Sequence, residues 1–209
     1  MMVILMSVNI SCYLISGLSG KCIVVRVYLS LQGEVFLPAI LGKRKGYDMN
    51  IKDLSKIYHV RRLAEADIDI IVEMCSKNKN FYKFHPPFVT PESILQDINS
   101  LPPGKTHDDL YYIGFFENDV LVAVMDLVLG YPNNKTAYIG FFMMNVQYQN
   151  KGIGTKIIED CKEYLKKINY NKIRLGVDKG NKQSFNFWTK NKFKQIGENE
   201  YIIMESEMF

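Results

Sequence analysis

The residues best suited to chemistry are two closely spaced glycines, Gly152 and Gly154, which follow an apolar run and precede an amphipathic one. Glycine lets a ligand approach the backbone closely and adopts backbone angles that other residues avoid. The apolar residues after them recur with a period near 3.6, which predicts a helix from about Gly152. These residues are Ile153, Ile157, Ile158, Cys161, Leu165 and Ile168. The start of such a helix attracts anions, because its first N–H groups are unpaired and its dipole is positive there.

This predicted helix start carries no acidic residue of its own. No Asp or Glu occurs between Asn145 and Ile158, whereas Lys151 and Lys156 flank the glycines. We therefore interpret the segment as a cradle for a phosphate group; the alternative is a strand-to-helix turn that needs glycine only for its geometry. The spacing excludes a Walker A loop, and Ile157 stands where the dinucleotide fingerprint needs a small third residue.

Two segments carry a resemblance to a known family. The pattern Gln/Arg-x-x-Gly-x-Gly/Ala, which Gln149, Gly152 and Gly154 match, resembles the acyl-CoA-binding motif of the GNAT superfamily of N-acetyltransferases. A second segment, 181–193, resembles the Asn-x-x-Ala…Tyr…Gly-Phe segment of that family. Its matching positions are Asn181, Ser184, Trp188, Lys192 and Phe193. The resemblance implies that acetyl-CoA donates its acetyl group to a primary amine of an acceptor, by direct attack in a ternary complex.

The resemblance also implies which residues contact acetyl-CoA. Backbone amides of the glycine loop would hold the pyrophosphate, and Asn181 would hydrogen-bond the pantetheine arm. The strand before the loop would contact the pantetheine and acetyl groups, with one of its amides polarising the thioester carbonyl. The implied residues are Phe142, Met143, Met144, Gln149, Asn150, Lys151, Gly152, Ile153, Gly154, Thr155, Asn181, Ser184 and Trp188.

Trp188 departs from the pattern of the family, in which many members carry a tyrosine at this place. An indole N–H cannot protonate the leaving thiolate, so we expect Trp188 to be a packing residue. The acid would then be water or a tyrosine, for which Tyr131 and Tyr138 are the candidates.

Direct attack by a neutral amine needs a base that removes the amine proton. Asp126 is the first candidate because it interrupts the apolar run 122–129, where a lone carboxylate would be costly to bury. A structural carboxylate paired with a nearby lysine or with a backbone donor is the alternative. His85 is the second candidate because an imidazole exchanges protons near neutral pH, although a loop histidine can also be merely solvated. The same loop carries aromatic residues that could line an acceptor pocket or cap the core: Tyr82, Phe84 and Phe88.

The elements that must position these residues follow from alternation, helical period and turn residues. We expect a strand, two helices, a three-strand antiparallel meander, the helix after the glycines, a parallel strand, a last helix and a hairpin. Their ranges are 58–63, 68–75, 90–101, 111–117, 120–129, 136–145, 152–168, 173–177, 181–190 and 193–204. This order resembles the GNAT fold over about 57–204. The resemblance implies an α/β (α+β) fold with a mixed, mostly antiparallel central sheet, helices on both faces, and a splay between the fourth and fifth strands.

Composition favours one globular domain at 49–209, preceded by an N-terminal extension at 1–48. Of 209 residues, 47% are hydrophobic and 23% are charged, which is ample for one core. The formal net charge of +4 suits a phosphorylated cofactor as well as a nucleic acid. The cysteines show no Cys-x-x-Cys pair or metal spacing, which favours a reduced, cytoplasmic protein without a metal. They are Cys12, Cys22, Cys75 and Cys161.

The extension is anomalous, because residues 1–20 carry no charge. A signal peptide would need a positive charge before its apolar run, and a membrane span would contain fewer polar residues. Lys45 and Gly46 require purine-rich codons shortly before Met49, where a bacterial ribosome-binding site would lie, so we hypothesise that Met49 is the natural or an alternative start. Alternation leaves a strand possible at Val25, Val27, Leu29 and Leu31.

Three classes of function therefore compete. The first is an acetyl-CoA-dependent N-acetyltransferase. The second is a non-catalytic acyl-CoA-binding or regulatory domain of the same fold, for which Trp188 is the best support. The third, a nucleic-acid-binding protein, has only the mild positive charge in its favour. We expect acetyl-CoA and an amine-bearing acceptor as partners, no nucleic acid or membrane, and a monomer or homodimer.

Overall fold

The computed structural model describes residues 6–8, 27–29 and 49–208. Strands β1 (Met6–Val8) and β2 (Val27–Leu29) pair antiparallel in a small sheet of their own. A strand is thus present at part of the alternating segment near Val27. Most of residues 1–48 lie outside the described ranges, so the extension and the alternative start at Met49 stay predictions.

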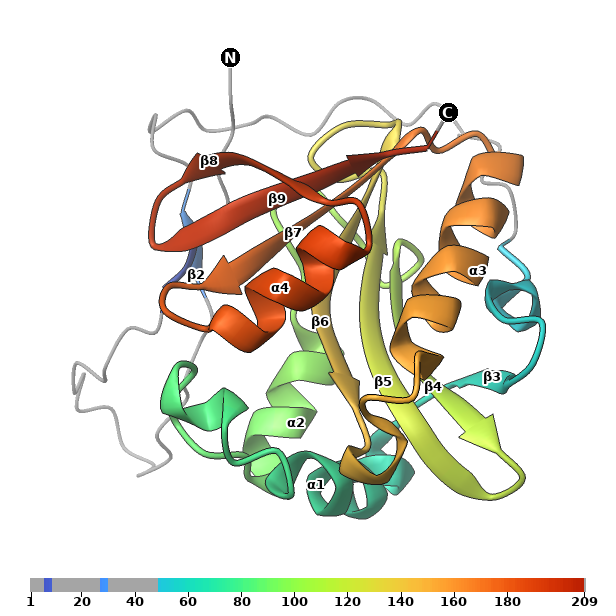
Figure 1. Ribbon diagram of the computed structural model, residues 1–209, viewed down its shortest axis with the longest axis vertical. Coiled ribbons are helices and arrows are strands. Elements are labelled where there is room, and N and C mark those ends of the chain that lie inside the picture. The colour runs from blue at the N-terminus through green and yellow to red at the C-terminus, as the bar shows by residue number, and fades with distance from the viewer. Residues whose placement is uncertain (1–5, 9–26, 30–48, 209) are drawn as a thin grey trace, which may run out of the picture.

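The main sheet has seven strands in the order β3-β4-β5-β6-β7-β9-β8 (Figure 1). Its strands are β3 (His59–Arg62), β4 (Leu110–Glu117), β5 (Val120–Leu129), β6 (Thr136–Met144), β7 (Lys172–Asp178), β8 (Lys194–Glu198) and β9 (Tyr201–Glu207). Within this sheet β6 and β7 run parallel, and every other neighbouring pair is antiparallel. The prediction of a mixed, mostly antiparallel sheet is confirmed.

Helices cover both faces of this sheet. Helices α1 (Ile68–Ser76) and α2 (Pro91–Asn99) pack on one hydrophobic cluster, and α3 (Ile153–Lys167) and α4 (Lys182–Lys190) on another. Four short 3-10 turns complete the described elements: η1 (Ile51–Leu54), η2 (Glu65–Asp67), η3 (Phe81–Lys83) and η4 (Val146–Tyr148). The predicted element order is therefore found in full.

The local signals in the sequence explain where two of these helices begin. Thr90 caps α2, because its hydroxyl oxygen accepts a hydrogen bond from the Ser93 N–H at 3.2 Å. Helix α2 ends at Asn99, before the expected limit at Leu101. Helix α3 begins at Ile153 after a left-handed Gly152, which confirms the predicted helix start.

Strands β6 and β7 pair over only part of their length. Their register joins Thr136–Ile139 to Lys172–Leu175 and then stops. Beyond it β6 continues along β5 and β7 continues along β9, so the two strands diverge (Figure 1). A bulge leaves Gly140 without a cross-strand partner on β5 just where the β6–β7 pairing ends. The expected splay is thus present beside the glycine loop.

Candidate active site

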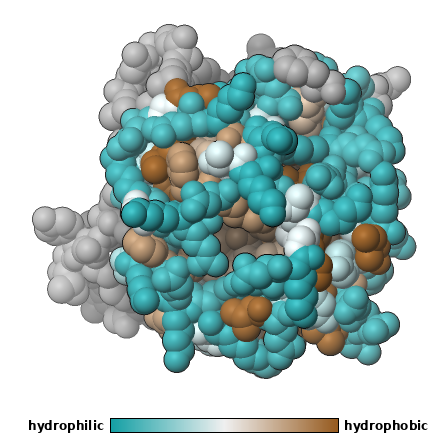
Figure 2. Space-filling model, viewed as in Figure 1, coloured by the Kyte–Doolittle hydropathy of each residue, from teal (hydrophilic) through white to brown (hydrophobic). Residues whose placement is uncertain are grey.

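A pocket of about 110 Å³ lies where β6 and β7 diverge. Phe142 and Trp188 reach it from the hydrophobic cluster under α3 and α4, whereas Phe81 and Phe141 reach it from the cluster under α1 and α2. Figure 2 shows a hollow with a mostly hydrophobic floor on this side of the molecule. Because the pocket is lined from both faces of the sheet, two substrates can approach the same point from opposite sides.

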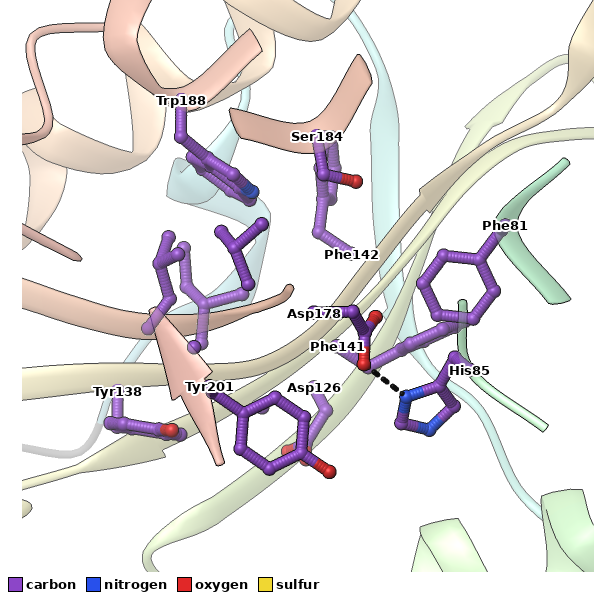
Figure 3. Close-up of a pocket in the computed structure, with 15 residues that line it drawn as sticks. Phe81, His85, Asp126, Tyr138, Phe141, Phe142, Asp178, Ser184, Trp188 and Tyr201 are labelled. Atoms are coloured by element: carbon purple, nitrogen blue, oxygen red, sulfur yellow. Dashed lines mark hydrogen bonds and ion pairs between the residues drawn. The ribbon is translucent and has the colours of Figure 1, made fainter. Parts of the chain in front are cut away.

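An imidazole and a carboxylate form one wall of the pocket. His85 Nδ1 lies 2.9 Å from Asp178 Oδ1, and their side chains are 24% and 13% exposed (Figure 3). An ionised carboxylate only accepts hydrogen bonds, so this contact favours the tautomer with the proton on Nδ1. Nε2 of His85 is then the ring nitrogen that can accept a proton.

The segment that carries His85 bridges the gap between the diverging strands. We call residues 80–85 the bridging loop. Asn80 Nδ2 donates to Gln183 Oε1 at 2.9 Å, and a Cβ on Gly180 would lie 3.5 Å from the Phe84 ring. Together with the His85 contact, these interactions tie the loop to the turn after β7 and to the start of α4. The loop therefore covers one end of the pocket.

The aromatic residues in and just after this loop differ in whether they line the pocket. Phe81 lines the pocket, with its ring centroid 5.2 Å from that of His85 and 5.9 Å from that of Phe141. Tyr82 and Phe88 contact each other at 4.8 Å between centroids and, like Phe84, lie outside the lining. Tyr82 packs on the core under α1 and α2, so core capping describes it better.

Asp126 lines the same pocket from β5. Its Cα partner on β6 is Phe141, and its carboxylate lies against Gly140, where an added Cβ would overlap Oδ2. Glycine at position 140 therefore makes room for this carboxylate at the edge of the gap. The two base candidates, Asp126 and His85, are 41 positions apart in the chain and face one pocket.

The glycine loop forms an open helix end at the other side of the site. Gly152 has φ of 79°, and a Cβ added there would meet nothing within 4 Å among the described residues. Asn150 is also left-handed, with φ of 60°. The first turn of α3 contains no acidic residue, and no side chain caps it in the described structure. This end has the geometry of an anion site.

Gly154 allows two helices to pack closely, and the side chain of Gln149 anchors the glycine loop by hydrogen bonds. A Cβ at Gly154 would lie 3.1 Å from the Phe187 ring, so glycine lets α3 approach α4. Gln149 Nε2 donates to Asn78 Oδ1 at 2.7 Å and to the Met144 carbonyl at 3.1 Å, which fixes the loop to the end of β6. The loop thus offers its backbone, because this side chain is already engaged.

The remaining positions implied for the cofactor connect the helix end to the pocket. The Phe187 ring stacks on Phe142, with 5.9 Å between centroids and 22° between planes. Asn181 caps α4 by accepting from the Ser184 N–H at 3.1 Å, and Ser184 lines the pocket. Met143 and Met144 are buried, at 4% and 9% exposure, as core residues are.

Trp188 is 7% exposed and belongs to an aromatic cluster. Its centroid lies 5.8 Å from Phe142, 5.0 Å from Phe187 and 4.9 Å from Phe193. This environment agrees with the expected packing role. Of the two tyrosines considered as acids, Tyr138 lines the pocket and Tyr131 packs behind it with 5.6 Å between ring centroids.

Sequence reasoning missed Asp178, Tyr201 and Gly140, all of which line the pocket. Asp178 carried a faint signal, since it ends an alternating strand just before a Gly-Asn pair. Gly140 interrupts an apolar strand, which often marks a bulge. Nothing local distinguishes Tyr201, because only its pairing with Asp178 across β7 and β9 brings it to the site.

Residues 76–193, more than half of the chain, match the model of the Acetyltransferase (GNAT) family. The chain belongs to the GNAT acetyltransferase family. The glycine loop, the splay and most of the pocket lie within the matched residues, while Tyr201 lies after them. Among curated proteins, none matches the sequence significantly.

Solved GNAT structures share the fold at low sequence identity. The PaiA N-acetyltransferase of Thermoplasma acidophilum, in complex with coenzyme A, is 20% identical with a TM-score of 0.56, over 71% of this chain and 98% of that one. An acetyltransferase of Thermus thermophilus is 15% identical with a TM-score of 0.60, over 70% and 92%. The ribosomal-protein-S18-alanine N-acetyltransferase of Escherichia coli is 12% identical with a TM-score of 0.52, over 71% and 92%.

Family membership supports acetyl transfer from an acyl-CoA as the general activity of this GNAT chain. In the described ranges, no three His, Cys, Asp or Glu side chains are grouped so that they could hold a metal ion. None of the described helices has the length and apolar character that crossing a membrane requires.

Proposed function

We propose that this GNAT protein transfers the acetyl group of acetyl-CoA to the primary amine of an acceptor by direct attack in a ternary complex. The observation that supports this best is the pocket at the splay, lined from both faces of the sheet. On the acyl-CoA side, Phe142 and Phe187 lie between the pocket and the open end of α3. On the acceptor side, His85 lines the pocket. Each substrate has its own approach, and no acetylated enzyme is required.

On the acyl-CoA side, the proposed contacts come mainly from backbone groups. The pyrophosphate would be held by the N–H groups of the loop 149–155, aided by the exposed Lys151. Beyond Ile139, β6 has no strand partner toward β7 in the described sheet, so its backbone there can hydrogen-bond the pantetheine arm. One such amide, near Phe142, would polarise the thioester carbonyl.

On the acceptor side, we favour His85 over Asp126 as the general base. A base works best when its affinity for protons suits neutral pH, which an imidazole meets better than a carboxylate. Asp178 orients His85 and would stabilise the imidazolium that forms. The amine nitrogen then bonds to the acetyl carbon as its proton passes to Nε2, and the C–S bond breaks.

The thiolate that leaves needs a proton, and the hydroxyls of Tyr138 and Tyr201 are in the lining to supply it. Trp188 has no part in this step, in keeping with its packed ring. Neither described cysteine is suited to a covalent intermediate. Cys75 and Cys161 are buried away from the pocket, and burial raises the pKa of the Cys75 thiol to about 12 and that of Cys161 as well.

The test is an acceptor panel in which free thiol release and the mass of the acetylated amine are followed together. The panel should contain small amines, an antibiotic with amino groups, a peptide N-terminus and a lysine peptide. Acetylation of any amine above the rate without enzyme supports the proposal. Binding of acetyl-CoA with no turnover on the whole panel would favour the non-catalytic acyl-CoA-binding domain. Absence of acetyl-CoA binding would contradict both the acetyltransferase and the non-catalytic alternative.

A further inference from the structure

We propose that Asn78 is a positioning residue, which ties the segment that carries His85 to the end of β6 and to the glycine loop. The inference rests on the proposed function, in which His85 is the general base, and it adds a residue that lies outside the lining of the described pocket. It draws on hydrogen bonds that lead from Gln149 through Asn78 to His85.

The side chain of Asn78 joins three segments of the chain. Its Oδ1 accepts from Gln149 Nε2 at 2.7 Å, and its Nδ2 donates to the carbonyls of Met144 at 3.1 Å and Met74 at 3.2 Å. Met144 ends β6, Gln149 begins the glycine loop, and Met74 lies in α1. An amide suits this place because it has an acceptor and two donors, whereas an aspartate would set a carboxylate against two carbonyl oxygens.

The backbone extends this anchor to His85. The Asn78 carbonyl accepts from the Phe81 N–H at 3.0 Å. The Phe81 carbonyl in turn accepts from the N–H groups of Phe84 at 3.0 Å and His85 at 3.1 Å, around the short turn η3. The position of His85 is thus linked to that of Asn78 by a hydrogen bond at each step.

This segment is held on both sides of the gap between β6 and β7. Asn78 fixes it on the β6 side, and His85 contacts Asp178 at the end of β7. The contact of Asn80 with Gln183 also lies on the β7 side, but both of its side chains are exposed, where water competes for the hydrogen bond. Without Asn78 the segment would keep its contacts beside β7 and lose its registration with β6, along which the acetyl group would lie.

This registration matters for the chemical step. A base acts only within hydrogen-bond reach of the amine, and a misplacement on the order of 1 Å can cost about a hundredfold in rate. Because Asn78 does not line the described pocket, its influence on the reaction passes through His85.

Asn78→Ala tests this role. With acetyl-CoA and the best amine of the panel both saturating, kcat should fall about tenfold, because the base is placed less accurately. The Kd for acetyl-CoA should stay within about threefold of wild type, since Gln149 keeps its contact with the Met144 carbonyl. Asn99→Ala is the matched control, because Asn99 ends α2 and its Nδ2 likewise donates to the carbonyl four residues earlier, at 2.8 Å.

Combination with His85→Gln shows whether Asn78 acts through His85. In the His85→Gln background, Asn78→Ala should lower kcat by less than about threefold, because effects that pass through one shared group are not additive. A general loss of structure, or an effect at the glycine loop, would instead lower kcat about tenfold in both backgrounds.

Gln149→Met provides a second variant at the partner of Asn78. It removes the amide that donates to Asn78 Oδ1 and keeps a side chain of similar length. It should lower kcat as Asn78→Ala does, and the two effects should combine to less than their product. Measured with and without His85→Gln, it also decides the question if Asn78→Ala does not fold.

Three outcomes would overturn the inference and leave acetyl transfer standing. These are a kcat of the folded variants within about threefold of wild type, a loss of kcat that is as large in the His85→Gln background, and a change in the Kd for acetyl-CoA alone. If the wild type binds acetyl-CoA but acetylates no amine, the proposed function fails, and this inference fails with it.

Discussion

At the scale of single residues, the pocket brings together two candidate bases in different surroundings, His85 and Asp126. The Asp178 carboxylate lies within hydrogen-bond distance of His85 Nδ1, and this contact leaves Nε2 as the nitrogen that can accept a proton. Asp126 has Gly140 beside its carboxylate, where the absence of a side chain makes room for it. A preference for Asp126 as base follows naturally from the sequence, where it interrupts an apolar strand. The partner of His85 is 93 positions away and could not be seen there.

The contact between His85 and Asp178 predicts that substitution of either residue slows turnover. His85→Gln should lower kcat by about a hundredfold or more, because a positioned base contributes on that order, and should leave acetyl-CoA binding unchanged. Asp178→Asn should also lower kcat, since the amide holds the productive tautomer less firmly. Steady-state kinetics with saturating acetyl-CoA measure both. His107→Gln, at an exposed histidine, is the control.

A different pattern would reverse this assignment. If Asp126→Asn lowers kcat by a hundredfold while His85→Gln leaves it within threefold of wild type, the carboxylate is the base and the imidazole is not.

Trp188 provides a second residue-scale prediction. Trp188→Phe should keep activity within a few-fold of wild type, because the indole packs among Phe142, Phe187 and Phe193 and carries no proton in the reaction. The smaller ring should lower the free energy of unfolding by about 1–3 kcal/mol. Denaturant unfolding and turnover measure the two effects. A thousandfold loss of kcat in a folded variant would assign the indole a role in catalysis.

At the scale of elements, β9 pairs with the whole length of β7, and an ion-pair cluster reinforces this pairing at the end where β7 also pairs with β6. Glu205 on β9 is the Cα partner of Arg174 on β7. Its carboxylate accepts from Lys172 Nζ at 2.7 Å and from Arg174 Nη2 at 2.6 Å, and its side chain is 7% exposed. Asp178, which contacts His85, is the last residue of β7 and lines the pocket, so the cluster helps to fix the strand that positions it.

This cluster predicts a pH-dependent contribution to stability. Burial of Glu205 opposes its ionisation, but the hydrogen bonds and the positive charges of Lys172 and Arg174 together outweigh burial and lower the pKa of the carboxyl below its ordinary value of 4.5. A lowered folded-state pKa contributes stability above the unfolded pKa, and that stability is lost as the pH falls through the folded value. Glu205→Gln should therefore destabilise the protein at neutral pH and progressively less below about pH 4.

Melting temperatures of wild type and Glu205→Gln between neutral and acidic pH check this. The exposed Glu200→Gln provides the baseline for a carboxylate without such partners. A difference in melting temperature that stays constant down to acid pH would show that the cluster contributes through packing and not through charge.

At the scale of the whole molecule, the sequence predicted what depends on neighbours in the chain. Periodicity located all four helices of the described chain, and glycine and proline located the turns around them. The glycine loop was found because its spacing is local, and its left-handed Gly152 agrees with that interpretation. Asp178 and Tyr201 were missed because strand pairing, which brings them together, leaves no local trace. The packing role of Gly154 could not be predicted even though its motif was recognised, because Phe187 comes close to it only when α3 packs on α4.

Thermal stabilisation by ligands tests whether the folded protein binds acyl-CoA, without reference to the acceptor. A ligand that binds only the folded state at a hundredfold excess over Kd stabilises it by about 2.7 kcal/mol. For a domain of this size, the melting temperature should rise by roughly 5–10 °C. Acetyl-CoA and CoA should both produce such a shift, whereas pantetheine, which lacks the pyrophosphate, should do little if the helix end recognises charge.

Two substitutions at one position separate charge from backbone strain. Gly152→Asn and Gly152→Asp both add a side chain at φ of 79°, a conformation that asparagine and aspartate tolerate better than most residues. Both should fold, because the added Cβ meets no atom of the described residues within 4 Å. The Asn variant should retain part of the shift with CoA, and the Asp variant should lose it, since its carboxylate occupies the anion site. Equal shifts in wild type and a folded Gly152→Asp protein would show that this helix end does not hold the pyrophosphate.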